Sequence, residues 1–317
     1  MSHLYFVGAV DLTWVLRGDF KFLDEYYAPH PFDIVWSNDI DRNACLTYEK
    51  YFKKKPFCDD INNLLDNPLL NHLIPSDIDV VLGGFPCQDF SHAGKRRGLD
   101  SSRGQLYKSM AKFVELTKPK VFVAENVKGI TTIQNGEVPE IIKADFETLG
   151  YDVSYKLHHV AHFGVPQSRE RVVFVGISKE VRTNNYEHPK NILTQEEWIC
   201  LDKAIGDLEF QSEGEIPNHF WSKAKMFKGT QGNSLVKKDK IGPTMRAEHH
   251  GNIEWHWSGN RRLSAREAAR IQSFPDDFIF HPSTSSAYKQ VGNAVPPVFG
   301  WHIADSISNF LQKETIN

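Results

Sequence analysis

The chain has 317 residues, 40% of them hydrophobic and 24% charged, with a formal net charge of −3 at pH 7. This is the composition of an ordinary globular protein; no apolar run is long enough to span a bilayer, and the N-terminus carries no secretory signal pattern. The cysteines, Cys45, Cys58, Cys87 and Cys200, form no CxxC pair, which argues against a zinc site or a disulfide framework and favours a reducing cytoplasm. No metal site is expected. Any nucleic-acid binding has to come from a local basic face, because the net charge is slightly negative.

The first part of the chain predicts strands that alternate with helices. Residues 4–9 predict a strand that enters a glycine turn, and residues 32–36 predict a second strand. An acidic residue after the second strand of such a sheet commonly binds the ribose hydroxyls of a cofactor, which makes Asp39 a candidate. Helix N-capping by Asn38 or Asp39 is an equally good interpretation. A helix is predicted over 42–52, and a short strand or turn over 58–61.

A buried strand at residues 80–82, followed by a turn that presents Cys87, is the central prediction. Gly83 and Gly84 let the backbone approach a ligand closely, and Pro86 fixes φ just before the thiol. Ligands bind at the carboxyl ends of strands in open α/β sheets. Cys87 is either a small buried hydrophobe or a thiol activated by the cations at 95–97. The basic stretch 91–103 is either solvated surface or a loop that closes over a phosphate backbone.

A second buried strand follows at residues 121–124, after a helix predicted over 105–117. Glu125 stands at its carboxyl end. The spacing between Cys87 and Glu125 suits one βαβ unit, which would place both on the same edge of a parallel sheet. Glu125 is therefore either a proton donor at this edge or a salt-bridged structural carboxylate.

Residues 139–149 predict a helix, and residues 153–157 and 171–177 predict a pair of strands. Between the two strands, Gln167, Arg169 and Arg171 alternate, so that an extended backbone would place all three on one face. Three such donors suit a phosphate, a base edge or a catalytic anion. A structural network of arginine and glutamate explains the pattern equally well.

The composition becomes polar from residue 178 to about residue 261, which indicates a small second domain with short irregular segments. The stretches 231–233, 237–240 and 243–252 are rich in residue types that recognise base edges in DNA grooves. Ser264 and Glu267 form a capping-box pattern at the start of a helix. Residues 290–297 then lead into a last helix at 298–311, with Pro297 in its first turn.

Five motifs together resemble the DNA cytosine-5 methyltransferases, chiefly the bacterial restriction-modification type. They occur in the order and spacing of that family: GGFPCQDFS (83–91), AENV (124–127), QSRER (167–171), RRLSAREAARIQSFPDDF (261–278) and QVGNAVPP (290–297). The resemblance implies an α/β fold with a doubly wound, mostly parallel sheet and a small, irregular target-recognition domain. The expected division is a catalytic domain of residues 1–177 plus 287–317, and a recognition domain and hinge of residues 178–286.

The resemblance also implies a mechanism and a set of site residues. The enzyme would flip a cytosine out of duplex DNA, and Cys87 would attack C6 of that base. Glu125 would protonate or hydrogen-bond N3, and Arg171 with Arg169 would orient the base and Glu125. S-adenosylmethionine would supply the methyl group to C5. The residues expected to bind this cofactor are Phe6, Gly8, Asp39, Ile40, Asp60, Ile61, Pro86 and Asn293.

A loop over residues 91–103 would close on the DNA, and Thr244 matches the family's threonine-plus-aliphatic pair in the recognition region. The residues expected to contact DNA are Gln88, Ser91, Arg96, Arg97, Arg103, Thr244 and Arg246. The expected protein is a cytoplasmic monomer that protects host DNA from a partner restriction endonuclease without stable contact.

The cofactor loop departs from the family pattern, which is roughly F-x-G-x-G-G-x-D-L-G. Here Phe6-Val7-Gly8-Ala9 is followed by the residues VDLTWVL (10–16), so two glycines that allow close approach of the cofactor are missing. One added base before a suitable coding sequence for 10–16 would make it encode Gly-Gly-Leu-Asp-Leu-Gly-Leu. We therefore hypothesise a compensated frameshift, either a sequencing error or a real lesion that weakens cofactor binding.

Two alternatives remain at this point. A tRNA cytosine-5 methyltransferase would share these motifs, but such enzymes usually carry a Cys-Phe-Thr signature after the recognition region, and this chain has none. A catalytically impaired DNA-binding relative would follow if the altered stretch 10–16 abolished cofactor binding.

Overall fold

The computed structural model describes residues 4–9 as backbone, together with residues 17–85, 106–182, 184–225, 232–247 and 253–316. The altered stretch 10–16 lies outside the described residues. So do seven of the predicted site residues, namely Pro86, Cys87, Gln88, Ser91, Arg96, Arg97 and Arg103.

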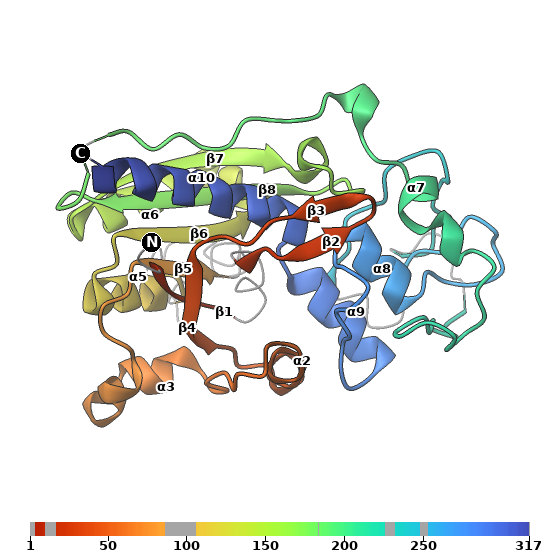
Figure 1. Cartoon of the computed structure of the whole chain (residues 1–317), viewed down its shortest axis with the longest axis horizontal. Coiled ribbons are helices and arrows are strands. Elements are labelled where there is room, and N and C mark those ends of the chain that lie inside the picture. Colours follow the sequence, from red (N-terminus) through yellow and green to blue (C-terminus); the bar gives the residue numbers. More distant parts are fainter. Residues whose placement is uncertain are drawn as a thin grey trace.

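A six-stranded sheet in the order β4-β1-β5-β6-β8-β7 forms the centre of the molecule (Figure 1). The four neighbours β4, β1, β5 and β6 pair in parallel, whereas β8 is antiparallel to both β6 and β7. The predicted α/β class with a mostly parallel sheet is thus confirmed. The strands are β1 (Leu4–Ala9), β4 (Phe32–Asn38), β5 (Val80–Gly84), β6 (Val121–Val127), β7 (Tyr151–His159) and β8 (Glu170–Ser178).

Side chains of the central strands alternate between two hydrophobic cores, one on each face of the sheet. Val80 and Leu82 of β5 point into one core and Val81 into the other, and all three are at most 5% exposed. The period of two in a strand explains this division, because successive side chains leave opposite faces. Both faces are therefore covered, as expected for parallel strands without polar positions.

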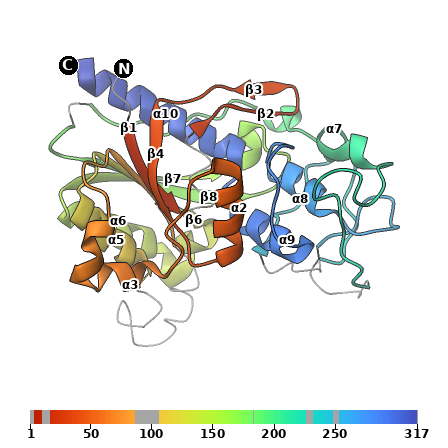
Figure 2. The same cartoon turned by 60° about the horizontal axis from the view of Figure 1, so that its bottom comes forward.

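Different helices cover the two faces of the sheet. The long helix α10 lies across one face, while α5 and α6 lie on the other (Figures 1 and 2). All five predicted helices are confirmed, and the last one continues to Ile316 instead of ending at residue 311. The α-helices are α2 (Arg42–Phe52), α3 (Ile61–Leu65), α5 (Leu106–Thr117), α6 (Val138–Thr148), α7 (Leu201–Ile205), α8 (Ala265–Ile271), α9 (Thr284–Asn293) and α10 (Pro297–Ile316).

The short 3₁₀ turns connect these elements. They are η1 (Pro68–Leu73), η2 (Lys128–Thr131), η3 (Ile133–Gly136), η4 (Val160–Phe163), η5 (Gln195–Glu197) and η6 (Gly206–Leu208). The turn η4 shows why β8 runs antiparallel to β7, since so short a connection cannot carry the chain back for a parallel crossover.

Besides α3 and α7, a hairpin and helix α9 were not predicted from the sequence. The hairpin of β2 (Phe20–Phe22) and β3 (Glu25–Tyr27) precedes β4, and the indole of Trp301 in α10 donates to the Ala28 carbonyl at 2.8 Å. Helix α9 begins after the N-cap Ser283, whose hydroxyl accepts from the Ser286 amide. Both elements are short and partly polar, so they are stabilised by packing rather than by a strong local pattern.

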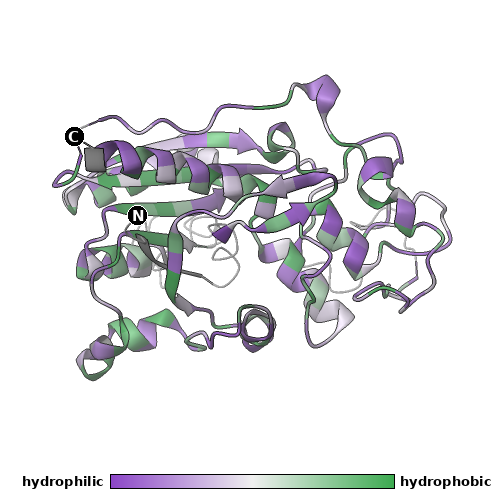
Figure 3. Ribbon diagram, in the orientation of Figure 1, coloured by the Kyte–Doolittle hydropathy of each residue, from purple (hydrophilic) through white to green (hydrophobic). Residues whose placement is uncertain are grey.

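The polar stretch after β8 first follows the sheet and then leaves it. The hydroxyls of Tyr186 and Ser306 of α10 are 2.7 Å apart, and Ser154 of β7 contacts His188 at 3.0 Å. Between η6 and α8 the described residues make isolated β-bridges, including Trp221 with Ser264, at the end of the molecule away from the sheet (Figure 1). This irregular end is largely hydrophilic (Figure 3). In the described part of the chain, no helix combines the length and hydropathy needed to cross a membrane.

Candidate active site

The carboxyl ends of β5 and β6 place Gly84, three residues before Cys87 in the sequence, beside Glu125. Gly84, the last residue of β5, is paired with Glu125 in the parallel register. The next residue along β6, Asn126, is 2% exposed, and its side-chain amide donates to the Phe85 carbonyl at 2.9 Å. This bond fixes the backbone at the point where the chain leaves β5 toward Cys87. Asn126 was not singled out from the sequence, although it is part of the AENV motif.

Glu125 forms an ion pair with Arg171 of the neighbouring strand β8. The side chains are 16% and 9% exposed, respectively, so water screens the pair only weakly. In the antiparallel register Arg171 stands opposite Val127, two residues beyond Glu125, and its long side chain reaches back along the diagonal. Burial lowers the pKa of Arg171, and the negative charge of Glu125 opposes that shift.

The predicted row of three donors does not act on one common target. Only Arg171 contacts Glu125, while Gln167 and Arg169 make hydrogen bonds in other directions. The amide nitrogen of Gln167 donates to the Ile271 carbonyl at 3.2 Å, and its oxygen accepts from the Met245 amide at 3.0 Å. The three side chains therefore do not share one partner, because Gln167 and Arg169 precede the regular part of β8 and bind the C-terminal segments. The alternative of an arginine–glutamate contact describes Arg171 and Glu125.

Arg169 joins three backbone carbonyls that are distant in sequence. Its Nη1 donates to Met245 O at 2.8 Å, and its Nη2 donates to Gly292 O at 3.0 Å and Ala294 O at 3.1 Å. The side chain is 2% exposed. These bonds connect the threonine-plus-aliphatic pair of the recognition region to the QVGNAVPP motif. They do not orient Glu125, which was the role expected for Arg169 beside Arg171.

Asp39 lies directly after β4, as predicted, and it does not cap the following helix. The N-cap of α2 is Asp41, whose carboxylate accepts from the Asn43 amide at 2.9 Å. Asp39 accepts from the backbone amide of Asp41 at 2.8 Å. Burial raises the pKa of Asp39 to about 6, although that hydrogen bond and the charge of Lys289 oppose the shift. The N-capping alternative for Asn38 and Asp39 is thus wrong.

A small cavity of about 50 Å³ connects Asp39 to the C-terminal motif. Asn293 and Ala294 line it together with Asp39 and with aromatic side chains that include Phe274 and Phe278. The ion pair between Lys289 of α9 and Asp41 at 2.6 Å holds the two sides together. The structure therefore brings together Asp39 and Asn293, which were both expected to bind a cofactor and which lie at opposite ends of the sequence.

The other predicted cofactor residues fit this arrangement in part. Phe6 and Gly8 are in β1, which lies between β4 and β5, so both are near the same sheet edge along the backbone. Ile40 is 68% exposed, and an exposed aliphatic side chain beside Asp39 is suited to cover a planar base. Asp60 is the N-cap of α3 and accepts from the Asn62 amide at 2.9 Å, and Ile61 begins that helix. The predicted strand or turn at 58–61 is thus a β-bridge at Phe57 followed by a helix start.

The predicted DNA-contacting residues Thr244 and Arg246 follow an isolated bridge between Gln167 and Gly242. The hydroxyl of Thr244 donates to the Ser168 carbonyl at 2.5 Å, and Arg246 is exposed. Thr244 thus attaches this segment to the residues just before β8, and Arg246 follows two residues later with an exposed side chain.

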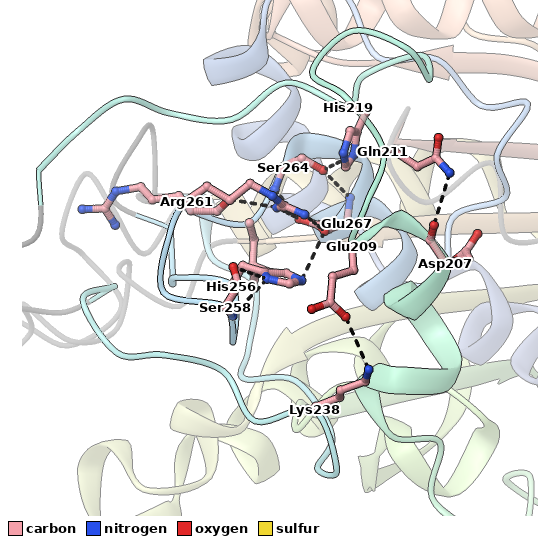
Figure 4. A network of polar contacts seen from close by, with 12 residues as sticks. Asp207, Glu209, Gln211, His219, Lys238, His256, Ser258, Arg261, Ser264 and Glu267 are labelled. Atoms are coloured by element: carbon pink, nitrogen blue, oxygen red, sulfur yellow. Dashed lines mark hydrogen bonds and ion pairs between the residues drawn. The ribbon is translucent and has the colours of Figure 1, made fainter.

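A buried carboxylate organises the start of α8 (Figure 4). Glu267 is fully buried and completes the predicted capping box with Ser264. Its carboxylate accepts hydrogen bonds from Nη1 and Nη2 of Arg261 at 2.6 and 2.7 Å. The ring of His256 lies 3.8 Å from the same carboxylate, and His219 contacts the Ser264 hydroxyl at 3.0 Å. This network connects the irregular end of the molecule to the helix that packs beside the sheet. Among the described residues, no group of three or more His, Cys, Asp or Glu side chains is placed to hold a metal ion.

Comparison with known proteins identifies the family. A sequence model of the C-5 cytosine-specific DNA methylases matches residues 21–239 and 218–309. The type II methyltransferase M.NgoFVII of Neisseria gonorrhoeae is 35% identical over 305 residues, covering 87% of this chain and 80% of that protein. The type II methyltransferase M.HhaI of Haemophilus parahaemolyticus is 31% identical over 281 residues, covering 83% of this chain and 84% of that protein.

Solved structures agree on the fold. The crystal structure of a prophage-encoded DNA modification methyltransferase of E. coli superposes with a TM-score of 0.69 at 20% identity, covering 98% of this chain and 99% of that one. The Dnmt2 methyltransferase of S. pombe superposes with a TM-score of 0.65 at 16% identity, with 98% coverage of both chains. Together with the family match over most of its length, these similarities show that the chain belongs to the C-5 cytosine-specific DNA methylases and is a DNA (cytosine-5) methyltransferase related to the type II enzymes of restriction-modification systems.

Proposed function

We propose that the enzyme methylates C5 of one cytosine within a short duplex sequence, after flipping that base out of the helix, through a covalent bond between Cys87 and C6. The observation that carries this proposal is the pairing of Gly84 with Glu125, with Arg171 held against that carboxylate. The register places the strand end that leads to Cys87 beside a charged pair that is mostly shielded from water. A flipped base held there would have its C6 and N3 near different protein groups.

The chemistry assigns a separate task to each group. The Cys87 thiolate adds to C6, the C5–C6 double bond opens, and electron density moves toward C5 and N3. Glu125, in its protonated form, donates a hydrogen bond or a proton to N3, which offsets the charge that develops there. Arg171 holds the Glu125 carboxyl group in place through the ion pair across β6 and β8. Loss of the C5 proton after methylation then breaks the bond to Cys87 and restores the aromatic ring.

S-adenosylmethionine, when bound, supplies the methyl group. Asp39 and Ile40 are suited to bind its adenosine part. The Asp39 carboxylate can accept hydrogen bonds from the ribose hydroxyls, and Ile40 presents an apolar surface beside it. Asn293 lines the same cavity from the other end of the chain. We assign Phe6, Gly8, Asp60, Ile61 and Pro86 to this cofactor site on the family pattern.

Arg169 receives a positioning role in this proposal, because its hydrogen bonds join Met245 to Gly292 and Ala294. Residues 178–286 form the target-recognition region and hinge, which enters along β7 and α10. Thr244, Arg246 and the segment that contains Gln88, Ser91, Arg96, Arg97 and Arg103 contact the DNA. We expect a monomer that acts in the cytoplasm and whose recognition sequence matches that of a partner endonuclease.

The test is covalent trapping on a random-sequence duplex pool in which 5-fluorocytosine replaces cytosine. The purified protein is incubated with this pool and S-adenosylmethionine, beside Cys87→Ser and beside a matched tRNA pool. We expect a covalent protein–DNA complex that needs both Cys87 and the cofactor, since fluorine cannot leave C5 as a proton does.

Three other results would contradict parts of the proposal. A complex with tRNA alone would transfer the function to RNA. An adduct that persists in Cys87→Ser would refute the assignment of the nucleophile. DNA binding without any adduct would identify an impaired relative, and restoring Gly-Gly-Leu-Asp-Leu-Gly-Leu at residues 10–16 should then recover the adduct if the altered stretch is the cause.

A further inference from the structure

A single buried arginine in the irregular region is bonded to three separate stretches of chain. Arg262 has no exposed surface, and its guanidinium lies 5.0 Å from the centre of the Trp255 ring. An arginine carries five N–H donors, and here each one has an acceptor within the protein. The acceptors are the carbonyls of Ala224, Lys225, Gly232 and Ile253 and the side-chain oxygen of Asn233, at 2.5 to 3.0 Å.

This complete set of partners explains how a charged side chain is tolerated in the interior. A buried guanidinium without acceptors would be strongly destabilising, and no carboxylate forms a close ion pair with Arg262 among the described contacts. Four of the five acceptors are backbone carbonyls, whose positions the guanidinium fixes in one planar geometry. Arg262 therefore determines the relative positions of residues 224–225, 232–233 and 253.

The neighbouring arginine has a different set of partners. Arg261 binds the Glu267 carboxylate at the start of α8, so it attaches this segment to the helix (Figure 4). Arg262, the next residue, faces the other way and binds the irregular region. The strand-like bridge of Trp255 with Arg262 continues this connection. Arg261 and Arg262 thus connect α8, which packs beside the sheet, to the three stretches of chain that bind Arg262.

We infer that Arg262 is a positioning residue for sequence recognition: its five hydrogen bonds set the spacing of the stretches 224–225, 232–233 and 253, and this spacing determines which bases the enzyme accepts. The inference rests on the proposed recognition role of residues 178–286. Discrimination between bases needs donors and acceptors held within a few tenths of an ångström, whereas contacts to DNA phosphates tolerate more displacement. Loosening these stretches should thus affect sequence discrimination more than total DNA binding.

The test compares Arg262→Lys with a matched control, Arg266→Lys. Arg266 is also fully buried, and it also binds backbone carbonyls, those of Pro217, Pro275 and Phe278. Two of these three carbonyls, those of Pro275 and Phe278, belong to the α8–α9 connection, and none of the three belongs to the stretches that bind Arg262. Lysine keeps the charge in both variants but has only three donors, so both should lose a comparable amount of stability.

The readout is sequence discrimination, measured on a random-sequence duplex pool by conversion sequencing of the methylated cytosines. For the preferred sequence and each single-base change, kcat/KM gives a discrimination ratio. We expect Arg262→Lys to lower at least one ratio by about tenfold or more, since one good base contact contributes discrimination of this order. Arg266→Lys should keep the wild-type ratios although its thermal stability falls similarly.

Equal ratios in wild type and Arg262→Lys would overturn the inference and leave Arg262 a purely structural residue. If Arg262→Lys does not fold, Trp255→Leu replaces it, since that change removes the ring beneath the guanidinium and keeps its five acceptors. Lowered ratios in Trp255→Leu would support the inference, and unchanged ratios would overturn it. Failure of the proposed function is distinguishable, because a wild-type protein that methylates no DNA cytosine would contradict the function itself, whatever the variants do.

Discussion

The carboxylate of Glu125 and the guanidinium of Arg171 form an ion pair across β6 and β8, two positions out of direct register. The pair lies at the carboxyl ends of the strands, where β5 ends beside Glu125. In the proposed mechanism, it positions the group that exchanges a hydrogen bond or proton with the base.

Glu125→Gln should lower kcat by about 10²- to 10⁴-fold, the usual contribution of a positioned general acid or base, because an amide cannot supply the proton. Affinity for DNA should change little. Single-turnover methylation and equilibrium binding on the same duplex would measure the two effects. Loss of binding in proportion to rate would contradict the assignment.

Arg171→Met should destabilise the fold by about 2–4 kcal/mol, because it leaves the carboxylate of Glu125 largely buried without its partner. The double variant Glu125→Gln with Arg171→Met should be less destabilised than Arg171→Met alone. Urea unfolding of the wild type, both single variants and the double variant checks this. Additive losses in the double variant would show that the pair is not coupled.

Asp39 predicts a pH dependence of cofactor binding. Its pKa in the free protein is raised to about 6, chiefly by burial. Only the ionised carboxylate can accept hydrogen bonds from two ribose hydroxyls. Affinity for S-adenosylmethionine should therefore be constant above about pH 7 and fall by up to about tenfold per pH unit below pH 6. Calorimetric titration from pH 5 to 8 measures it. Lys289→Met removes a nearby cation and should move the midpoint to higher pH, and an unchanged midpoint would argue against this role of Asp39.

The backbone of Gly292 lies so close to Arg246 and Ala247 that we expect this position to tolerate no side chain. A Cβ atom built at this position would lie 2.2 Å from the amide nitrogen of Ala247 and from the carbonyl carbon of Arg246. Gly292→Ala should cost about 1–3 kcal/mol of stability and should reduce methylation, because the displaced backbone belongs to the recognition segment. Gly150→Ala is the control: its φ of +92° is strained, but no atom lies within 4 Å of the added Cβ. Equal activity losses in both variants would contradict the steric explanation.

Buried histidines predict acid sensitivity of the fold. Burial lowers the pKa of His158 to about 3, and of His188 and His302 to about 4. Their ordinary pKa in the unfolded chain is about 6.5, so between pH 6.5 and 4 the unfolded chain binds protons that the folded chain excludes. Stability is therefore full above pH 6.5 and falls below it by about 1.4 kcal/mol per pH unit for each histidine. Asp39, with a raised pKa, has the opposite sign and offsets one of them.

Urea unfolding at pH 7, 6 and 5 measures this slope. His158→Phe should reduce the slope by about one proton, because the ring packs between Phe163 and Phe299 and phenylalanine cannot titrate. Asp39→Asn should make the slope steeper. If neither variant changes the slope, other groups cause the acid sensitivity.

Local patterns determined much of this molecule from the sequence alone. The apolar runs at 80–82 and 121–124 predicted the central strands, since a strand buried on both faces has no polar position. The spacing of Cys87 and Glu125 predicted that their strands are parallel neighbours, because a βαβ unit makes adjacent strands parallel, and β5 and β6 pair in this way with Gly84 opposite Glu125. The capping box at Ser264 and Glu267 predicted the start of α8, since its hydrogen bonds are local.

The partners of the buried polar side chains were decided only by the tertiary structure. Gln167, Arg169 and Arg171 share one short stretch and one alternation, yet they have different partners. Gln167 and Arg169 make hydrogen bonds to Met245 and Gly292, whereas Arg171 forms an ion pair with Glu125. Whether a guanidinium binds a carboxylate or carbonyls depends on which distant segments fold against it, and sequence spacing does not contain this information. The same holds for Arg262, which is one residue away from Arg261 and has five acceptors from three stretches of chain. Its neighbour binds Glu267 instead, because consecutive side chains on an extended backbone leave opposite faces.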